Sequence, residues 1–212
     1  MSHAYLYLVD IIRIFMCLKI ILFFIFLLIN HKLYANDNCK DIKGIFFDLG
    51  DTLVESVGGG QFQLRPGAQQ MIDDLLLIDK RLGIITNVPN DWSIVDLEAI
   101  LVSPSFLGDF EIVVLSSQAP APKPDPAIFN YSFSLLTNPP AIEQMAFVTE
   151  NLDHIANFAI NPTEGARAVG MIGIHLSDGI SSPFTDYTVS TDDFQTIVNI
   201  SNEHVFCNGF EL

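Results

Sequence analysis

The sequence predicts an α/β fold, a doubly wound three-layer parallel sheet, from two observations. Five short runs of nearly continuous apolar residues recur along the chain, each too short for a helix. Amphipathic stretches of helical length separate these runs. Such runs are typical of strands buried on both faces of a parallel sheet, and their alternation with helices indicates a doubly wound arrangement.

The expected strands and helices follow one another in a regular order. The strands are expected over residues 44–49, 82–86, 111–115, 145–149 and 171–175, and the helices over 66–79, 91–101, 126–136 and 192–200. Pro66 suits the first turn of its helix, which places Met71, Ile72 and Leu75 on one apolar side. Sheets of this kind bind ligands outside the carboxyl ends of their strands, so functional residues are expected there.

The composition narrows the classes of function. The chain has 212 residues with 10 Lys and Arg against 25 Asp and Glu, a net charge of -15. Binding of a nucleic-acid backbone needs a basic surface, so that class of partner is not expected. The negative net charge also argues against adhesion to an anionic membrane by a polybasic face. Binding of a phosphate-bearing substrate to so acidic a chain requires a cationic side chain or a bound metal that makes the electrostatic potential positive at the binding site.

The N-terminal segment has the features of an export signal. Residues 20–29 read IILFFIFLLI, which is the length of a signal-peptide apolar region and about half of a membrane-spanning helix. We therefore expect residues 1–35 to be a signal peptide, with Met16 as an alternative start, and 36–212 to be a single domain that is periplasmic or secreted. An uncleaved anchor over about residues 11–29 is the alternative, although two basic residues inside it disfavour it.

Two cysteines remain in the expected mature domain, Cys39 and Cys207, close to its two ends. In an oxidising compartment such thiols often pair, so we expect a Cys39–Cys207 disulfide. A bridge across so long a loop would contribute on the order of 5 kcal/mol in the chain-entropy model. The alternative is two unrelated buried thiols. Metal binding by cysteine is not expected, because the chain has no CxxC pair.

Polar residues stand at the ends of the expected strands. Asp48 ends the first strand, Thr86 and Asn87 end the second, Lys123 follows the third and Glu150 follows the fourth. Each is ordinary alone, since an Asp after a strand is commonly a cap or turn residue and a Lys is commonly solvated. Together, an acid, a hydroxyl, an ammonium and a second acid converge on one edge of the sheet, which indicates a site.

Four segments resemble the haloacid dehalogenase (HAD) superfamily of hydrolases: FFDLGDTLVES, LGIITN, KPDPAIF and EGARAVGMIGIHL. The resemblance covers about residues 42–200. It implies a HAD-like Rossmannoid fold and a Mg²⁺-dependent phosphomonoesterase that acts through an aspartyl-phosphate. The phosphorylated substrate would be a small molecule or a macromolecular phosphoester.

The resemblance also implies roles for individual residues. Asp48 would be the nucleophile, and Thr86 and Lys123 would complete the catalytic set. Thr86, the backbone N–H of Asn87 and Lys123 would bind the phosphoryl group. The Mg²⁺ ligands would be Asp48, the main-chain carbonyl of Gly50 and Glu150, with Asp153 in support; Mg²⁺ prefers such oxygen ligands.

The sequence departs from the family pattern at three places, one of which is an extra stretch around residues 157–163. The other two bear on the chemistry. The family's phosphatases usually carry an Asp as general acid two residues after the nucleophile, where this chain has Gly50 and then Asp51. The fourth motif, usually Gly-Asp, is Thr149-Glu150. These departures favour an alternative, a catalytically impaired HAD-fold binding or structural module of the cell envelope. A third reading is carbon–halogen hydrolysis, which needs the same nucleophile and no Mg²⁺.

The space available for a cap is small. About a dozen residues separate Leu53 from Arg65, and they include three consecutive glycines, 58–60. We expect a small flap and no large cap domain, which leaves an open site. An open site implies a larger phosphoester or closure by another subunit in a homo-oligomer. Contact with a membrane is expected only through an uncleaved leader.

Overall fold

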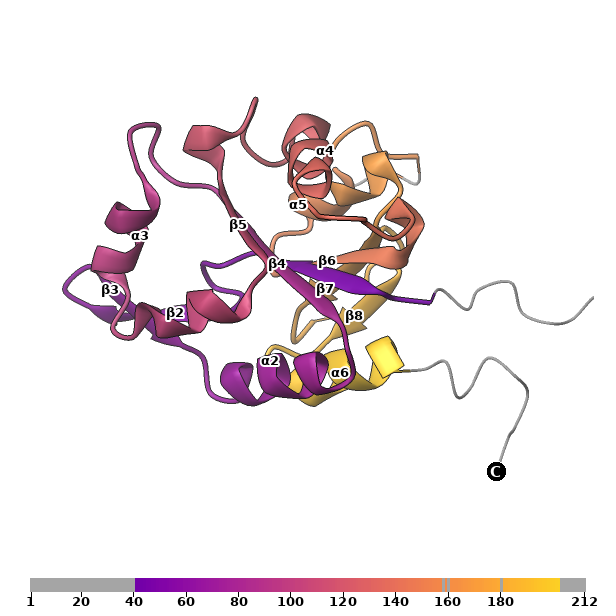
Figure 1. The fold of residues 1–212 in the computed structure, drawn as a ribbon. Helices are drawn as coiled ribbons and strands as arrows, with labels where there is room; N and C mark the ends of the chain where they lie inside the picture. Colours follow the sequence, from indigo (N-terminus) through magenta and orange to yellow (C-terminus); the bar gives the residue numbers. More distant parts are fainter. Residues whose placement is uncertain (1–40, 158, 160, 180, 203–212) are drawn as a thin grey trace, which may run out of the picture. The chain divides into compact units, whose positions relative to one another are not determined.

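A parallel sheet of six strands forms the centre of the fold (Figure 1). The structure is a computed structural model that describes residues 41–157, 159, 161–179 and 181–202. The strand order is β5-β4-β1-β6-β7-β8, and every neighbouring pair is parallel. The strands are β1 Gly44–Phe47, β4 Arg81–Thr86, β5 Ile112–Leu115, β6 Met145–Thr149, β7 Ile172–Leu176 and β8 Tyr187–Val189. The predicted doubly wound parallel sheet is confirmed.

Alternate residues of the central strands enter two separate apolar cores. In β1, Ile45 and Phe47 belong to one cluster of buried side chains, whereas Phe46 belongs to the other. The same alternation separates Ile84 from Ile85 in β4. Successive side chains of a strand point to opposite faces, so a continuous apolar run is the composition that a strand buried on both faces requires.

Helices cover both faces of the sheet (Figure 1). The helices α2 (Ala68–Leu77) and α6 (Phe194–Asn202) contact each other and contribute to the first core. The helices α4 (Pro126–Ser134) and α5 (Asp153–Ala156) contribute to the second core. The remaining elements are α3 (Ile94–Ile100) and the 3₁₀ turns η1 (Pro104–Asp109), η2 (Ser116–Gln118), η3 (Ile142–Gln144) and η4 (Ala166–Val169).

A small antiparallel hairpin occupies the segment in which we expected a flap. Its strands are β2 (Val54–Gly58) and β3 (Gln61–Leu64). The hairpin is attached to the end of α3, because the Val102 N–H donates to the Phe62 carbonyl at 2.8 Å. Neither β8 nor the one-turn helix α5 was predicted from the sequence. Both are too short for a period to be read from the sequence.

Several expectations lie outside the residues that the structure describes. They are the signal peptide over residues 1–35 with its alternative start at Met16, and the Cys39–Cys207 disulfide. Within the described part of the chain, none of the helices has the length and apolar character needed to cross a bilayer.

Candidate active site

Asp48 directly follows the central strand β1, at the carboxyl edge of the sheet. Its backbone N–H donates to the Val148 carbonyl at 2.8 Å, which continues the pairing of β1 with β6. Only 5% of the residue is exposed. Because β1 lies between β4 and β6, the residues that end those two strands, Thr86 and Thr149, are brought to the same edge.

Lys123 forms a buried ion pair with Asp48. The Lys123 Nζ lies 2.5 Å from Asp48 Oδ1, and it also donates to the Ile85 carbonyl at 2.8 Å. Burial raises the pKa of Asp48, but the charge of Lys123 and the hydrogen bonds to Asp48 outweigh it, so the pKa lies below its usual 3.8. Asp48 is therefore a carboxylate at neutral pH, as a nucleophile must be.

Asn87 holds the backbone of Lys123 in place. The Asn87 Nδ2 donates to the Lys123 carbonyl at 2.9 Å, and the Lys123 N–H donates to Asn87 Oδ1 at 2.9 Å. This reciprocal pair joins the end of β4 to the segment that precedes α4. The Asn87 side chain therefore positions Lys123, a role that we did not predict from the sequence.

Thr149 brings the two acids of the site together. Its Oγ1 lies 3.1 Å from Asp48 Oδ2 and 3.2 Å from Glu150 Oε2. Glu150 Oε2 also accepts a hydrogen bond from Thr52 Oγ1 at 2.5 Å. A hydroxyl carries a single proton, so Thr149 donates to only one of its two carboxylates at a time. The arrangement therefore concentrates negative charge between Asp48 and Glu150.

His154 is a further contact of Asp48, one that we did not predict from the sequence. Its Nδ1 lies 3.2 Å from Asp48 Oδ2, whereas Lys123 contacts the other carboxylate oxygen, Oδ1. His154 lies in the short helix α5, four residues after Glu150. Its position on the turn that follows β6 was the available signal, but the five histidines form no motif spacing that would have singled it out.

The acidic residues of this edge fit a magnesium ion in their chemistry. Mg²⁺ is usually bound through one or two carboxylates and keeps several waters. Asp48 and Glu150 supply two carboxylates, which lie 3.1 Å and 3.2 Å from the same hydroxyl oxygen, Thr149 Oγ1. Among the described residues there is no group of three or more His, Cys, Asp or Glu side chains placed to hold a metal ion. The Asp153 side chain is exposed, at the first residue of α5.

Gly50 lies in open surroundings. Residue 50 is exposed, and a Cβ added to it would have no atom within 4 Å. The following residue, Asp51, has φ 54°, in the left-handed region that Asp tolerates better than most residues. The backbone turns sharply here, so Asp51 does not occupy the place that an acid at position 50 would have.

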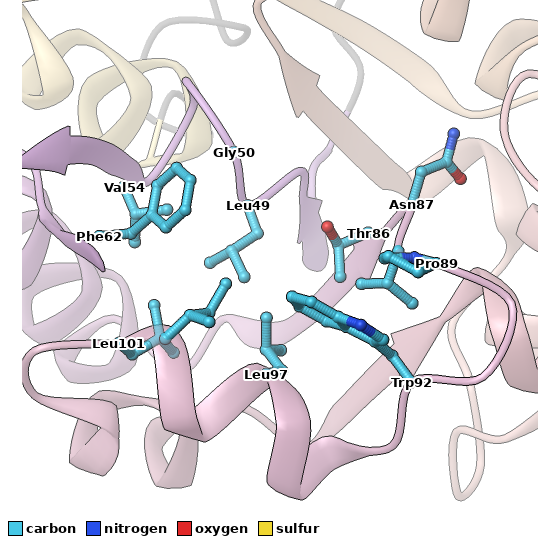
Figure 2. Close-up of a pocket in the computed structure, with 12 residues that line it drawn as sticks. Leu49, Gly50, Val54, Phe62, Thr86, Asn87, Pro89, Trp92, Leu97 and Leu101 are labelled. Atoms are coloured by element: carbon cyan, nitrogen blue, oxygen red, sulfur yellow. The ribbon is translucent and has the colours of Figure 1, made fainter. Parts of the chain in front are cut away.

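An apolar pocket of about 220 Å³ adjoins this edge (Figure 2). Leu49, Gly50, Thr86 and Asn87 form the part of its wall nearest to Asp48. The rest of the wall comes from the β2–β3 hairpin, the 88–92 loop and α3. Its main apolar side chains are Val54, Phe62, Trp92, Leu97 and Leu101. The pocket therefore begins at the residues that flank the candidate nucleophile.

The chain resembles known proteins in structure. By sequence it matches neither a protein-family profile nor a curated protein. A HAD phosphatase from Thermococcus onnurineus superposes with a TM-score of 0.50 at 21% identity, over 65% of this chain and 59% of that one. The L-2-haloacid dehalogenase from Xanthobacter autotrophicus gives 0.54 at 14% identity, over 74% and 98%. Magnesium-bound YfnB from Bacillus subtilis, assigned as a HAD-hydrolase, gives 0.51 at 18%, over 66% and 56%.

These similarities establish the HAD-like Rossmannoid fold of the chain. The chain spans a little over half the length of YfnB and of the phosphatase, but nearly all of the dehalogenase. Phosphatase and dehalogenase superpose about equally well, so the fold does not choose between the two reactions. That choice depends on the site.

Proposed function

We propose that the chain is a HAD-type hydrolase that cleaves phosphate monoesters, with Asp48 as the nucleophile. The observation that carries the proposal is the burial of Asp48 at the end of the central strand, kept ionised by Lys123 at 2.5 Å. Burial removes water that would screen the carboxylate, and the ion pair fixes its orientation. The second acid, Glu150, supports phosphoryl transfer over carbon–halogen cleavage, because it would hold the metal ion that only phosphoryl transfer requires.

Two displacements at phosphorus make up the proposed reaction. A carboxylate oxygen of Asp48 attacks phosphorus, the bond to the leaving oxygen breaks with its electron pair, and an aspartyl-phosphate forms. Water then attacks the phosphorus of that intermediate, which releases inorganic phosphate, returns the electron pair to Asp48 and gives a proton to solvent. Lys123 offsets the charge on Asp48 and on the phosphoryl oxygens, and Thr86 and the Asn87 N–H are proposed to bind those oxygens.

Residue 50 determines how the leaving oxygen is protonated. Glycine has no side chain that can donate a proton, so in the proposed reaction the leaving oxygen takes its proton from water. General-acid assistance typically contributes about 10²- to 10⁴-fold. The activity should therefore be low for alkyl phosphates and higher for phosphates of acidic alcohols such as phenols, which leave without protonation.

Mg²⁺ is proposed to be bound by Asp48, Glu150 and the Gly50 carbonyl, with Asp153 in support. When bound, it would neutralise charge on the phosphoryl group, which two facing carboxylates otherwise repel. The Thr149 and His154 contacts occupy Asp48 Oδ2, so a cation on that oxygen would replace them. Isothermal titration of the chain with MgCl₂ measures this binding without turnover, and Glu150→Gln should weaken it.

Release of phosphate from p-nitrophenyl phosphate tests the activity. We expect release that requires Mg²⁺, stops with EDTA and disappears in Asp48→Asn. Asp125→Asn is a matched control, because Asp125 caps α4 by accepting from the Ala127 N–H and is exposed. Absence of release from a panel of phosphoesters, with Mg²⁺ bound, would contradict the proposal and favour a non-catalytic HAD-fold module of the cell envelope.

The proposed setting is the periplasm or the exterior of the cell. It rests on the apolar run at 20–29 and on the cysteine pair, both outside the described residues. Sequencing the N-terminus of exported material should give Asn36, whereas a retained Met1 or Met16 would contradict cleavage. Thiol titration of the unfolded, unreduced chain should find Cys39 and Cys207 blocked.

A further inference from the structure

The apolar pocket beside the active site has a size and a wall that suit one hydrophobic ring. A cavity of about 150 Å³ lined by Leu, Ile and Phe holds benzene in a well-studied case. At about 220 Å³, this pocket has room for a single ring with a small substituent. Ligand sites of this kind are lined mostly by apolar and aromatic side chains, with a few polar groups at one end.

The wall of the pocket is preformed. The Ser117 hydroxyl donates to the Trp92 carbonyl at 2.6 Å, and the Val88 N–H donates to Ser116 Oγ at 2.9 Å. These bonds fix the 88–92 loop to the turn that follows β5. On the opposite side, the hydrogen bond from Val102 to Phe62 fixes the hairpin to α3. A ligand would therefore enter without the cost of ordering the wall.

The polar end of the pocket coincides with the proposed phosphoryl site. Thr86 and Asn87 line it, and Leu49 in its wall donates its backbone N–H to Asp48 Oδ1 at 2.8 Å. Figure 2 shows Leu49, Leu97 and Trp92 directed toward one shared space, with Thr86 at its edge. A group attached to a phosphoryl at Asp48 would thus meet an apolar surface.

From this geometry, and resting on the proposed function, we infer the substrate class: a phosphate monoester whose alcohol is a single apolar ring, such as an aryl phosphate. The pocket binds the ring, and Asp48, Thr86 and Lys123 meet the phosphoryl group. Gly50 supports an aryl phosphate independently of the pocket, because a phenolate can leave without protonation by a general acid. Phe62 and Trp92 are the specificity-determining residues.

Trp92 provides a direct readout, because it is the single tryptophan of the chain. Its emission is followed while the wild-type chain is titrated with phenylphosphonate and, separately, with methylphosphonate. The two probes differ only in the ring, and neither has a P–O ester bond to cleave. We expect phenylphosphonate to change the emission and to bind at least about tenfold more tightly, since the ring buries apolar area.

Two variants on the hairpin locate the effect. Phe62→Ala removes a pocket side chain and should reduce the preference for phenylphosphonate several-fold or more. Val57→Ala is the matched control, because Val57 lies on the same hairpin, is 48% exposed and is not part of the wall. The inference would be overturned if both probes bound equally or if neither bound. It would also be overturned if Phe62→Ala kept the wild-type preference for phenylphosphonate and the emission of Trp92 did not change on binding.

The outcome is separable from that of the proposed activity. Hydrolysis of p-nitrophenyl phosphate without a phenyl preference would retain the hydrolase and remove the aryl pocket. A phenyl preference without hydrolysis of any phosphoester would retain the ring pocket and remove the catalytic proposal.

Discussion

Lys123 and Asp48 form an ion pair that is almost fully enclosed: the Nζ lies 2.5 Å from Oδ1, and the two side chains are 0% and 7% exposed. Burial lowers the pKa of Lys123 and the charge of Asp48 raises it, with the net pKa below the usual 10.5. The Phe147 ring, whose centroid is 5.3 Å from Nζ, adds a face of negative potential. Each charge therefore offsets part of the free-energy cost of burying the other.

Removal of Lys123 should destabilise the fold. Lys123→Met leaves Asp48 buried without its partner, and breaking a buried pair in this way costs about 3–5 kcal/mol. Urea unfolding at pH 7 measures the change. In the double variant Asp48→Asn, Lys123→Met no buried charge remains, so we expect part of the loss to be recovered.

Lys43→Met is the matched control for this cycle. Lys43 pairs with Asp41 at 2.7 Å, but its side chain is 45% exposed, and such pairs contribute about 0–1 kcal/mol. A loss for Lys123→Met no larger than that of the control would show that the Asp48 pair does not stabilise the site.

Introducing an acid at position 50 should increase turnover. Residue 50 has open space around it and no positive φ, so Gly50→Asp places a carboxyl there without displacing atoms. If the hydrolase proposal holds, the new acid can protonate the leaving oxygen, an effect of about 10²-fold or more. The rate with an alkyl phosphate is the sensitive measurement, because its leaving group needs the proton.

Gly50→Asn distinguishes the effect of an acidic proton at position 50 from the effect of a larger side chain there. It has nearly the same volume but no acidic proton, so its rate should stay near that of the wild-type chain. Equal increases for Asp and Asn would contradict a general-acid effect.

Gly165 is required by the close approach of its backbone to α5. It has φ 82° and ψ 178°, a conformation nearly restricted to glycine, and a Cβ there would lie 2.5 Å from the Ile155 backbone in α5. Its N–H also donates to the Pro124 carbonyl at 2.6 Å. Gly165→Ala should therefore lower stability by about 2 kcal/mol or more, measured as a fall in Tm.

Gly108→Ala is the control substitution. Gly108 lies in the turn η1, and an added Cβ would meet no atom within 4 Å. Its free energy of unfolding should stay within about 0.5 kcal/mol of the wild-type value, as for ordinary surface substitutions, so its Tm should change little. Similar falls in Tm for both variants would rule out the steric explanation.

The Arg81–Glu111 pair predicts a pH-dependent stability difference. The Arg81 Nε donates to Glu111 Oε2 at 2.8 Å, and this bond, against a smaller effect of burial, holds the pKa of Glu111 below its usual 4.5. A lowered folded-state pKa gives stability that is complete above pH 4.5 and disappears as the pH falls through the folded-state value. The two side chains are 25% and 32% exposed, so solvent screens the pair in part and its contribution is about 0.5–1 kcal/mol.

Glu111→Gln removes this titration. The free energy of unfolding of the variant should be lower than that of the wild-type chain by this amount at pH 7, and the difference should shrink as the pH falls below 4.5. Chemical unfolding at pH 7, 5 and 3.5 measures the difference. A difference that persists unchanged at pH 3.5 would contradict the assignment.

The local pattern of the sequence determined the class of fold. The five apolar runs correspond to β1, β4, β5, β6 and β7 to within one or two residues, because a strand buried on both faces has no polar face to interrupt its run. The predicted helices are also present, although α2 begins at Ala68 and α6 at Phe194, two residues later than the pattern indicated. Ends of elements depend on capping and packing, which a period does not reveal.

The sequence also determined which residues meet at the carboxyl edge. Asp48, Thr86 and Glu150 come at or just after the ends of β1, β4 and β6, Lys123 lies in the connection from β5 to α4, and strands in one parallel sheet end at the same edge. Their convergence follows from chain order alone once the sheet is assumed.

Only the tertiary structure decided how these side chains are connected. His154 and Thr149 contact Asp48, and Asn87 binds the backbone of Lys123, through hydrogen bonds whose partners are far apart in sequence, and no spacing rule encodes such contacts. The pocket depends in the same way on a hairpin, a loop and a helix meeting in space. Periodicity records which face of an element is buried, whereas the identity of its neighbour is fixed by packing of the whole chain.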